Sequence, residues 1–401
     1  MKVQVIAKTD NNLNAAAADA VKEIKERAGK PGQFLNWIKV LPENQLKNLD
    51  NLYEMAAKAK EGFDDLAILG IGGSRHTTES MMNMLGIKNV HFFSSVDPIS
   101  FNRFIEPLNL ARTKFMVVSK SGGTMETTTA YNKVDEILRH TFKTDNIQHR
   151  LVAMTDASAE KSKLRKIVNE GKISLSGFVH DDVGGRFSIF DDATIFALAF
   201  AGVAKNDVRK MLESSLAAQE SFLSENVDDN MALQLATFNV NAYKAGKRKH
   251  FIEYFSDAFT GATLWEKQLK NESLKARIST DTNVGPGYLH YNAEADLDEE
   301  NTDSFFTFVN YKTDDKVTSA ILEGVVTAYS AQHPVSRIIL DDLTLETIAQ
   351  FIELKHFETI YTGNILRREL GLISPMETAM PEVLQPNVEK YKAEVRKAMA
   401  K

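Results

Sequence analysis

Hydrophobic and polar positions along the chain define two alternating kinds of segment. Short apolar runs, bounded by polar residues or glycine, predict strands buried on both faces, and amphipathic segments lie between them. In the first half, we predict strands at residues 66–69, 90–94, 115–119 and 151–155. Strands of about five residues alternating with helices of about 10–15 residues are typical of βαβ units and a parallel sheet.

The second half repeats this alternation. After a mostly helical stretch at about residues 191–247, the pattern predicts strands at 250–255, 305–309 and 336–340 and helices at 260–275, 316–330 and 345–361. The first 60 residues read mostly as helix, and a polar helix is expected at 388–399. We therefore predict an α/β protein with a helical N-terminal extension (1–60), two domains (61–205 and 206–375) and a C-terminal tail helix (376–401).

Composition narrows the class of protein. The 401 residues are 43% hydrophobic and 25% charged, as in an ordinary globular enzyme. No run of about 18 apolar residues predicts a membrane span, and the apolar run near the N-terminus is too short for a signal peptide, so we expect a cytoplasmic protein. The net charge of −6, without a basic tail, argues against nucleic-acid binding. The absence of cysteine excludes disulfides, thiolate metal sites and cysteine nucleophiles.

A glycine loop follows the first predicted strand. It reads Gly70-Ile71-Gly72-Gly73-Ser74 and precedes a predicted helix, an arrangement that lets backbone N–H groups approach an anion. Arg75 stands where a dinucleotide loop would have its third glycine, although Asp97 is placed like a ribose-binding acid. On its own, the loop is compatible with an anion site, a nicotinamide site or a plain turn.

A second loop carries hydroxyl groups. Ser119, Ser121 and Thr124 surround a diglycine turn between a strand and a helix, and each can donate to a phosphate oxygen. The G-K-[ST] order of a nucleoside-triphosphate loop is missing. Three hydroxyls in six residues, beside a second glycine loop, favour one phosphate monoester held between adjacent strand ends over simple helix capping.

Four further residue groups could take part in chemistry, each with a simpler alternative. Arg186 follows a diglycine and could place a guanidinium beside an oxyanion, although most arginines are solvated. Gln268 and Glu272 share a helix face, where a solvated glutamate is more common than a proton shuttle. His290, in a glycine–proline turn, could exchange protons or be structural, and Lys392 could simply be a solvated lysine on the terminal helix. No metal-binding or G-x-S-x-G motif is present.

In this order, the segments resemble the glucose-6-phosphate isomerase (phosphoglucose isomerase) family. The family motifs are I-G-I-G-G-S, S-K-[ST]-x-[TG]-T-x-E-T, G-G-R-[FY]-S, Q-x-x-x-E-S and Q-x-x-V-E-x-x-K, matched here at residues 69–74, 119–127, 184–188, 268–273 and 385–392. The resemblance implies two sugar-isomerase (SIS) domains, each a mainly parallel sheet flanked by helices. The chain departs from the family after Ser74, after Ser273 and around His290, and it resembles a divergent, short bacterial-type member.

The resemblance also implies a mechanism without metal, nucleotide or redox cofactor. Residues of substrate binding would be Gly73, Ser74, Ser119, Lys120, Ser121, Thr124 and Gln268. His290 with Lys392 would assist ring opening, Glu272 would shuttle a proton between carbons 2 and 1, and Arg186 would stabilise the enediolate. Family members are typically homodimers whose histidine comes from the partner subunit. The reaction expected is interconversion of glucose 6-phosphate and fructose 6-phosphate in glycolysis and gluconeogenesis.

Three alternatives remain open at this stage. The first is another aldose–ketose isomerase of the same fold, with dual glucose and mannose phosphate specificity or an amino sugar as substrate. The second is a SIS protein that binds a sugar phosphate for regulation without catalysis. A dinucleotide oxidoreductase is a more distant third, since the hydroxyl loop would have no role there.

Overall fold

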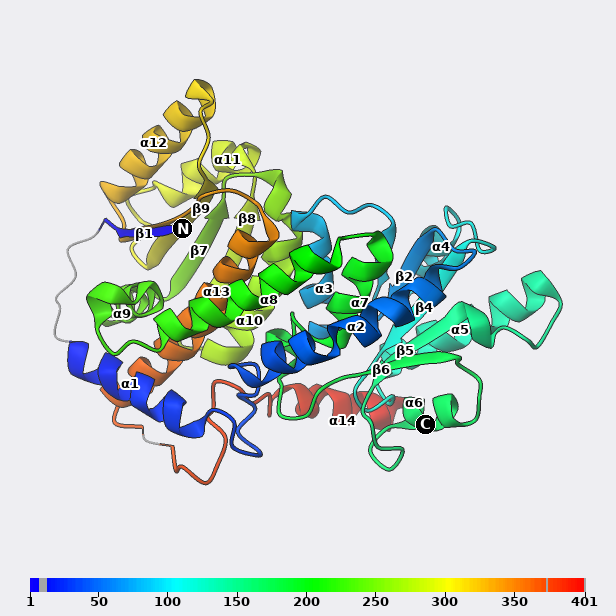
Figure 1. The fold of residues 1–401 in the computed structure, drawn as a ribbon. Coiled ribbons are helices and arrows are strands. Elements are labelled where there is room, and N and C mark those ends of the chain that lie inside the picture. Colours follow the sequence, from blue (N-terminus) through cyan, green and yellow to red (C-terminus); the bar gives the residue numbers. More distant parts are fainter. Residues whose placement is uncertain (7–12, 373, 400–401) are drawn as a thin grey trace.

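Two five-stranded sheets form the framework of the protein, in a computed structural model that describes residues 1–6, 13–372 and 374–399. In Figure 1 the sheets occupy opposite halves of the molecule. The first sheet is entirely parallel, and its strands, in spatial order, are β3 (Val90–Phe93), β2 (Asp65–Leu69), β4 (Thr113–Val118), β5 (Leu151–Thr155) and β6 (Leu175–Phe178).

The second sheet repeats this topology with one change. Its strands, in the matching spatial order, are β8 (Ser279–Val284), β7 (Lys249–Tyr254), β9 (Ser304–Tyr311), β10 (Val335–Leu340) and β1 (Lys2–Val5). The first four are parallel, whereas β1 comes from the start of the chain and pairs antiparallel with β10. The prediction of an α/β protein with two mainly parallel sheets is therefore confirmed.

Helices cover both sheets and fill the space between them. Their bounds are α1 (Asn14–Arg27), α2 (Val40–Lys60), α3 (Gly73–Met84), α4 (Pro98–Ile105), α5 (Met125–Phe142), α6 (Lys163–Asn169), α7 (Asp192–Ala201), α8 (Lys205–Phe222), α9 (Met231–Lys244), α10 (Thr260–Leu274), α11 (Pro286–Asp296), α12 (Lys316–Ser330), α13 (Leu345–Glu369) and α14 (Val388–Met399). None of the helices described is long and apolar enough to cross a membrane.

The core sits where the two halves meet. Almost every residue of α13 is buried, because this helix packs against α1, α8, α9 and α10. On the other side of the seam α2 packs on α7 and α8, and α3 packs directly on α10. The contact between α3 and α10 brings together the first glycine loop, where α3 begins, and the helix that carries Glu272.

The structure differs from the sequence prediction in three strands, in one helix end and in helix α11, which stands where a turn was expected. Strands β1, β6 and β8 were not predicted, and all three lie at sheet edges. An edge strand is covered less completely, so its sequence has a weaker apolar signal. Helix α13 continues to Glu369, well beyond residue 361 where the prediction ended.

Candidate active site

A cavity of about 400 Å³ lies at the carboxyl ends of β2 and β4. Its lining residues are Ile71, Ser74, Val118, Ser119, Lys120, Ser121, Thr124, Thr127, Asp156, Lys161 and Asp181. Strands β2 and β4 are neighbours, and the chain leaves them toward opposite sides of the sheet. Ligands of open α/β sheets bind at such a switch point. The structure thus brings the glycine loop and the hydroxyl loop together around one cavity.

Hydrogen bonds hold the hydroxyl loop in a shape suited to an anion. Its carbonyl oxygens turn away from the cavity, since they accept from Thr155 Oγ1 (2.7 Å), the Asp156 N–H (3.2 Å) and the Lys163 N–H (2.9 Å). The Ser119 and Ser121 hydroxyl oxygens accept from the N–H groups of the diglycine at 3.1 and 3.2 Å. The Ser119 hydroxyl itself donates to Thr124 Oγ1 at 3.4 Å, whereas the Ser121 hydroxyl can donate its proton to a ligand, and the N-terminus of α5 adds positive potential.

Two lysines stand at the rim of this cavity. The ammonium groups of Lys120 and Lys161 lie 3.4 and 3.6 Å from the carboxylate of Asp181. Sequence reasoning included Lys120 but missed Lys161, which comes from the loop after β5 and belongs to no motif. An anion in the cavity would compete with Asp181 for both cations.

Glycine is required where the first loop meets the Arg186 segment. A Cβ atom added to Gly73 would lie 2.1 Å from the carbonyl carbon of Gly185, so the two backbones are in direct contact. Gly72, with φ of +57°, lies against the Gln268 amide. Three separate motifs therefore converge beside the cavity, with two of them in contact through backbone alone.

Arg186 is fully buried and all its contacts are with the protein. Its guanidinium donates to Glu272 Oε2 (3.0 Å), Ser273 Oγ (3.0 Å) and the Glu382 carbonyl (2.6 Å). Trp265 Nε1 donates to the Arg186 carbonyl at 2.9 Å and fixes the backbone as well. Burial lowers the pKa of Arg186 to about 10, with the Glu272 carboxylate opposing the shift, so the group is charged at neutral pH.

Glu272 is the partly exposed carboxylate at the centre of these contacts. Its side chain is 24% exposed, its Oε2 accepts from Arg186, and its Oε1 accepts from Gln268 Nε2 at 3.0 Å. The four-residue spacing predicted that Gln268 and Glu272 share a face, and α10 places both toward α3. A carboxylate oriented through both oxygens, yet open to solvent, is suited to proton transfer.

The structure corrects the expected turn around His290. Gly285 has φ of +80° and precedes a helix, α11, in which Pro286 occupies the first turn. Proline is favoured at that position because it has no backbone N–H, and an N–H in the first helical turn would have no intrahelical partner. His290 is therefore on an exposed helix face, near Tyr288 and Tyr291, which are 42% and 60% exposed. It does not line the cavity described above.

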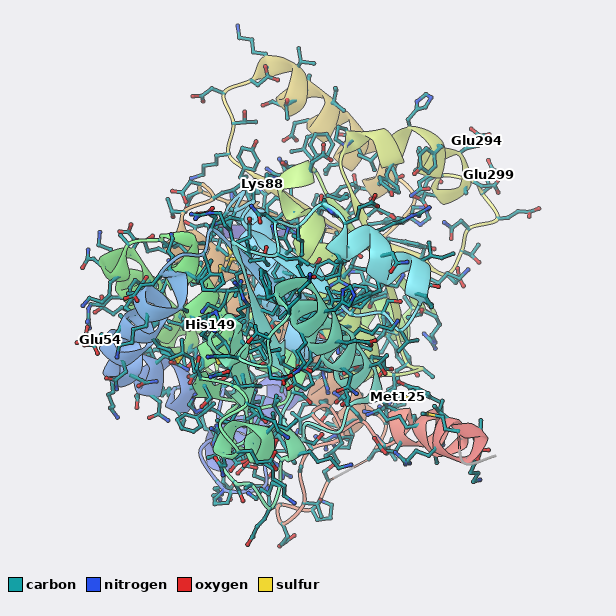
Figure 2. The ribbon with its side chains drawn as sticks, turned by 90° about the vertical axis from the view of Figure 1, so that its right-hand side faces the viewer. Glu54, Lys88, Met125, His149, Glu294 and Glu299 are labelled. Carbon is teal, nitrogen blue, oxygen red and sulfur yellow. The ribbon has the colours of Figure 1, made fainter. Side chains whose placement is uncertain are left out.

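Lys392 lies near the hydroxyl loop but on its outer side. It borders a hollow of about 240 Å³ between α14 and the start of α5, together with Ser121, Gly123 and Thr124. Its ammonium group pairs with Glu389 at 3.1 Å. Figure 2 shows α14 extending from the body of the molecule beside Met125, the first residue of α5.

The divergent residue Arg75 does not enter the cavity. Its guanidinium forms two hydrogen bonds of 2.8 Å with Glu79 on the next turn of α3 and a third with Ser94. Arg75, the residue after Ser74 that departs from the family pattern, is thus held by an ion pair within α3. Ser74 itself still lines the cavity.

The repeated sheets and the anion-type cavity at a switch point define a protein of the SIS class. The phosphoglucose isomerase family model matches residues 51–314, and the chain belongs to this family. A curated glucose-6-phosphate isomerase from Staphylococcus aureus (strain Mu3 / ATCC 700698) is 25% identical, with 92% of this chain and 88% of the relative covered. Staphylococcus saprophyticus has a glucose-6-phosphate isomerase that is also 25% identical.

Solved structures show the same fold. A hypothetical protein from Thermus thermophilus has a TM-score of 0.83 at 21% identity, covering 96% of this chain and 95% of that one. The glucose-6-phosphate isomerase from Chlamydia trachomatis has a TM-score of 0.75 at 16% identity, covering 99% of this chain and 81% of that one. At these identities, the likeness establishes architecture, while family membership rests on the sequence match.

Proposed function

We propose that the protein interconverts glucose 6-phosphate and fructose 6-phosphate by proton transfer through a cis-enediol(ate). The observation that carries the proposal is the convergence of Glu272, held by Arg186 and Gln268, with the glycine loop that borders the anion cavity. Relatives named glucose-6-phosphate isomerase support the choice of substrate.

In this proposal, the cavity holds the phosphate group. The Ser119, Ser121 and Thr124 hydroxyls and the start of α5 would donate to its oxygens, with Lys120 neutralising its charge. The sugar would extend past Gly73 and Ser74 toward Glu272. Hydroxyls, backbone amides and two lysines allow a chain of net charge −6 to bind a dianion locally.

The proton transfer itself would use Glu272. Its carboxylate would take the proton from carbon 2 of the open-chain aldose and deliver a proton to carbon 1 of the enediolate, while the hydroxyl proton of oxygen 2 moves to oxygen 1 as the carbonyl forms at carbon 2. Arg186 would fix the carboxylate and, from its buried position next to Glu272, would stabilise the negative charge of the enediolate electrostatically. His290 and Lys392 would assist ring opening, with His290 supplied by the partner subunit of a homodimer, since it lies on an exposed face of its own chain.

The test is isomerisation of fructose 6-phosphate by the purified chain, followed with a coupled dehydrogenase, with mannose 6-phosphate measured alongside. Glu272→Gln should lower kcat by about 10²-fold or more while leaving phosphate binding intact, because proton shuttling by a positioned base contributes about that much. Glu54→Gln, on the exposed outer face of α2, is the matched control. Near-normal kcat in the Glu272 variant would reject the assignment of the base.

No turnover of either sugar by an intact dimer would instead favour a regulatory sugar-phosphate-binding protein. Turnover of both sugars at similar rates would favour the dual-specificity isomerase.

A further inference from the structure

A second polar cluster lies next to the proposed active site and has no part in the mechanism above. It consists of His180, which follows β6, Asp191 and Asp192 at the start of α7, and Gln45 from α2. His180 Nε2 lies 3.0 Å from Asp192 Oδ1 and 3.4 Å from Asp191 Oδ1. Among the residues that the structure describes, this His–Asp–Asp group is the one whose geometry could hold a metal ion.

Hydrogen bonds within the cluster leave one buried amide oxygen, Gln45 Oε1, without a partner. His180 Nε2 also lies 3.1 Å from Gln45 Nε2, which donates to Asp192 Oδ1 at 2.7 Å. A proton on His180 Nε2 would face the amide N–H of Gln45, and a lone pair there would face two carboxylate oxygens. Gln45 is 0% exposed, and its Oε1 is buried without a hydrogen-bond partner.

The buried carboxylates add an electrostatic demand. Asp191 and Asp192 are 4% and 1% exposed, and their carboxylates accept from the backbone N–H groups of Asp192 and Phe178, each at 2.9 Å. Adjacent buried carboxylates are unfavourable unless cations or hydrogen bonds compensate them. A protonated imidazole on His180 supplies one positive charge beside the two carboxylates, whereas a divalent cation bound between them would supply two.

We propose that His180, Asp191, Asp192 and Gln45 form a binding site for a divalent transition-metal ion such as Zn²⁺. Ligand bonds of about 2.0–2.2 Å place neighbouring ligand atoms roughly 3.0–3.5 Å apart, which matches the spacing around His180 Nε2. A half-turn of the Gln45 amide presents its oxygen as the fourth ligand, and a mixed set of imidazole, carboxylate and amide suits Zn²⁺ better than Mg²⁺.

The ion would stabilise the structure around the proposed active site and would take no part in the reaction. Asp191 also lines a hollow of about 90 Å³ with Ser74, Lys120 and Gly185. The His180 carbonyl accepts from Lys120 Nζ at 3.3 Å. The ion would therefore clamp α2, the loop after β6 and the start of α7, and so hold both ends of the segment that contains Arg186.

Metal binding is tested directly on the full chain after treatment with EDTA, by equilibrium dialysis against Zn²⁺ and by thermal unfolding with and without Zn²⁺. We expect one tight equivalent per chain and a higher Tm with Zn²⁺, because an ion that binds only the folded state stabilises it. Co²⁺ in place of Zn²⁺ should give a visible d–d spectrum of a site with four or five nitrogen and oxygen ligands.

Three variants make the outcome specific. His180→Ala and Asp191→Asn should weaken Zn²⁺ affinity more than about tenfold, since loss even of a group that supports a ligand costs about 10–100-fold. Gln45→Glu should bind Zn²⁺ more tightly, a gain that a folding defect does not produce. His91→Ala is the control, because His91 pairs with Asp65 at 3.1 Å on the same sheet but has no further ligands nearby among the described residues.

No stoichiometric Zn²⁺, or unchanged affinity in both His180→Ala and Asp191→Asn, would overturn the proposal. The dialysis and the Tm measurement do not depend on turnover, so their result stands whether or not the proposed isomerase activity is found.

Discussion

At the scale of single residues, contact between two glycines determines how the halves of the proposed active site meet. Gly73 begins α3 and lies against the backbone of Gly185, the residue before Arg186. Any side chain at Gly73 has to displace main chain, which cannot turn aside as a flexible side chain does. The position of Arg186 therefore depends on the absence of a side chain at Gly73. Because Arg186 holds Glu272, the position of Glu272 depends on it as well.

Gly73→Ala should consequently damage activity more than stability. We expect a loss in kcat/KM of about 100-fold, typical when catalytic groups move by about 1 Å, and a loss of about 1–3 kcal/mol in the free energy of unfolding. Steady-state kinetics and urea denaturation measure the two effects. Gly324→Ala, on the exposed face of α12 with no atom near the new methyl, should change neither by much, and equal behaviour of the two variants would contradict this account.

A buried glutamate in the second sheet, Glu253, should make the free energy of unfolding depend on pH. Burial raises the pKa of Glu253 to about 7 from 4.5, although Asn283 donates to it at 2.7 Å. Between pH 4.5 and 7 the folded protein keeps a proton that the unfolded chain has released, so this group lowers the free energy of unfolding as pH rises. The contribution is fully present below pH 4.5 and is lost above pH 7.

Glu253→Gln removes this dependence because an amide does not ionise. The variant should be more stable than the parent at pH 8, by up to about 3 kcal/mol, and nearly equal to it at pH 4.5. Urea unfolding at the two pH values measures the difference. Glu299→Gln, an exposed residue labelled in Figure 2, should show no such pH-dependent gain, and a constant gain in the Glu253 variant would mean that packing is responsible.

At the scale of elements, the sequence predicted the central strands and most helices well. Strands β2, β4 and β5 are buried almost completely, so their residues had to be apolar and were recognisable. Edge strand β8 reads Ser-Thr-Asp-Thr-Asn-Val and has no apolar pattern to recognise. This strand forms because it pairs with β7, and that pairing cannot be recognised from the residues of β8 alone.

Helix α14 offers a test in which fold and activity separate. None of its residues is buried, yet it borders the hydroxyl loop through Lys392. Removal of residues 385–401 should leave Tm within a few degrees and lower kcat by about 10²-fold, if Lys392 takes part in acid–base chemistry. Circular dichroism and the coupled assay measure both.

Lys392→Ala should reproduce most of that loss. Lys397→Ala is its control, because each lysine pairs with a glutamate three residues earlier on the same helix. An equal effect of the two substitutions would remove Lys392 from the mechanism.

At the scale of the whole molecule, two halves of the same topology have different chemistry. The loop after β4 carries hydroxyls and glycines, whereas the corresponding loop after β9 reads Lys312-Thr313-Asp314-Asp315. A hollow of about 540 Å³ lies there too, but its cations Lys312 and Arg337 pair with Asp341 and Glu323, and Asp314 adds a further carboxylate to its lining. Those carboxylates disfavour a phosphate, so we infer that the first half binds the anion while the second contributes Glu272 and His290.

Much of this arrangement could be predicted from sequence, because each motif has a chemical signature of its own. The hydroxyl loop and the pairing of Gln268 with Glu272 follow from local spacing. Lys161 and the His180 cluster could not be predicted in this way, since their members come from separate segments and no spacing rule connects them. The sequence predicted a turn around His290, whereas the residue lies on an exposed face of helix α11, a helix that the glycine–proline pair begins.

Mixing two impaired variants tests whether His290 of one subunit completes the site of another. If His290 is donated across the interface, a heterodimer of Glu272→Gln and His290→Ala subunits contains one site with both residues intact and one with neither. After subunit exchange at equal amounts, about half of the dimers are mixed, so activity should recover to about a quarter of the parent value. No recovery from verified heterodimers would place His290 and Glu272 of one subunit in the same site, or His290 outside the site.

Strand β1 also has a consequence for the order of events during synthesis. Its partner, β10, begins 330 residues after β1 ends. Strand β1 therefore cannot join the second sheet until most of the chain has been made. At about 5–20 residues per second, the first strand waits roughly 20–60 seconds on the ribosome. The first sheet, whose strands all lie between residues 65 and 178, can form during that interval. Chaperones that bind the emerging chain would therefore encounter a complete first sheet and a second sheet with which β1 has not yet paired.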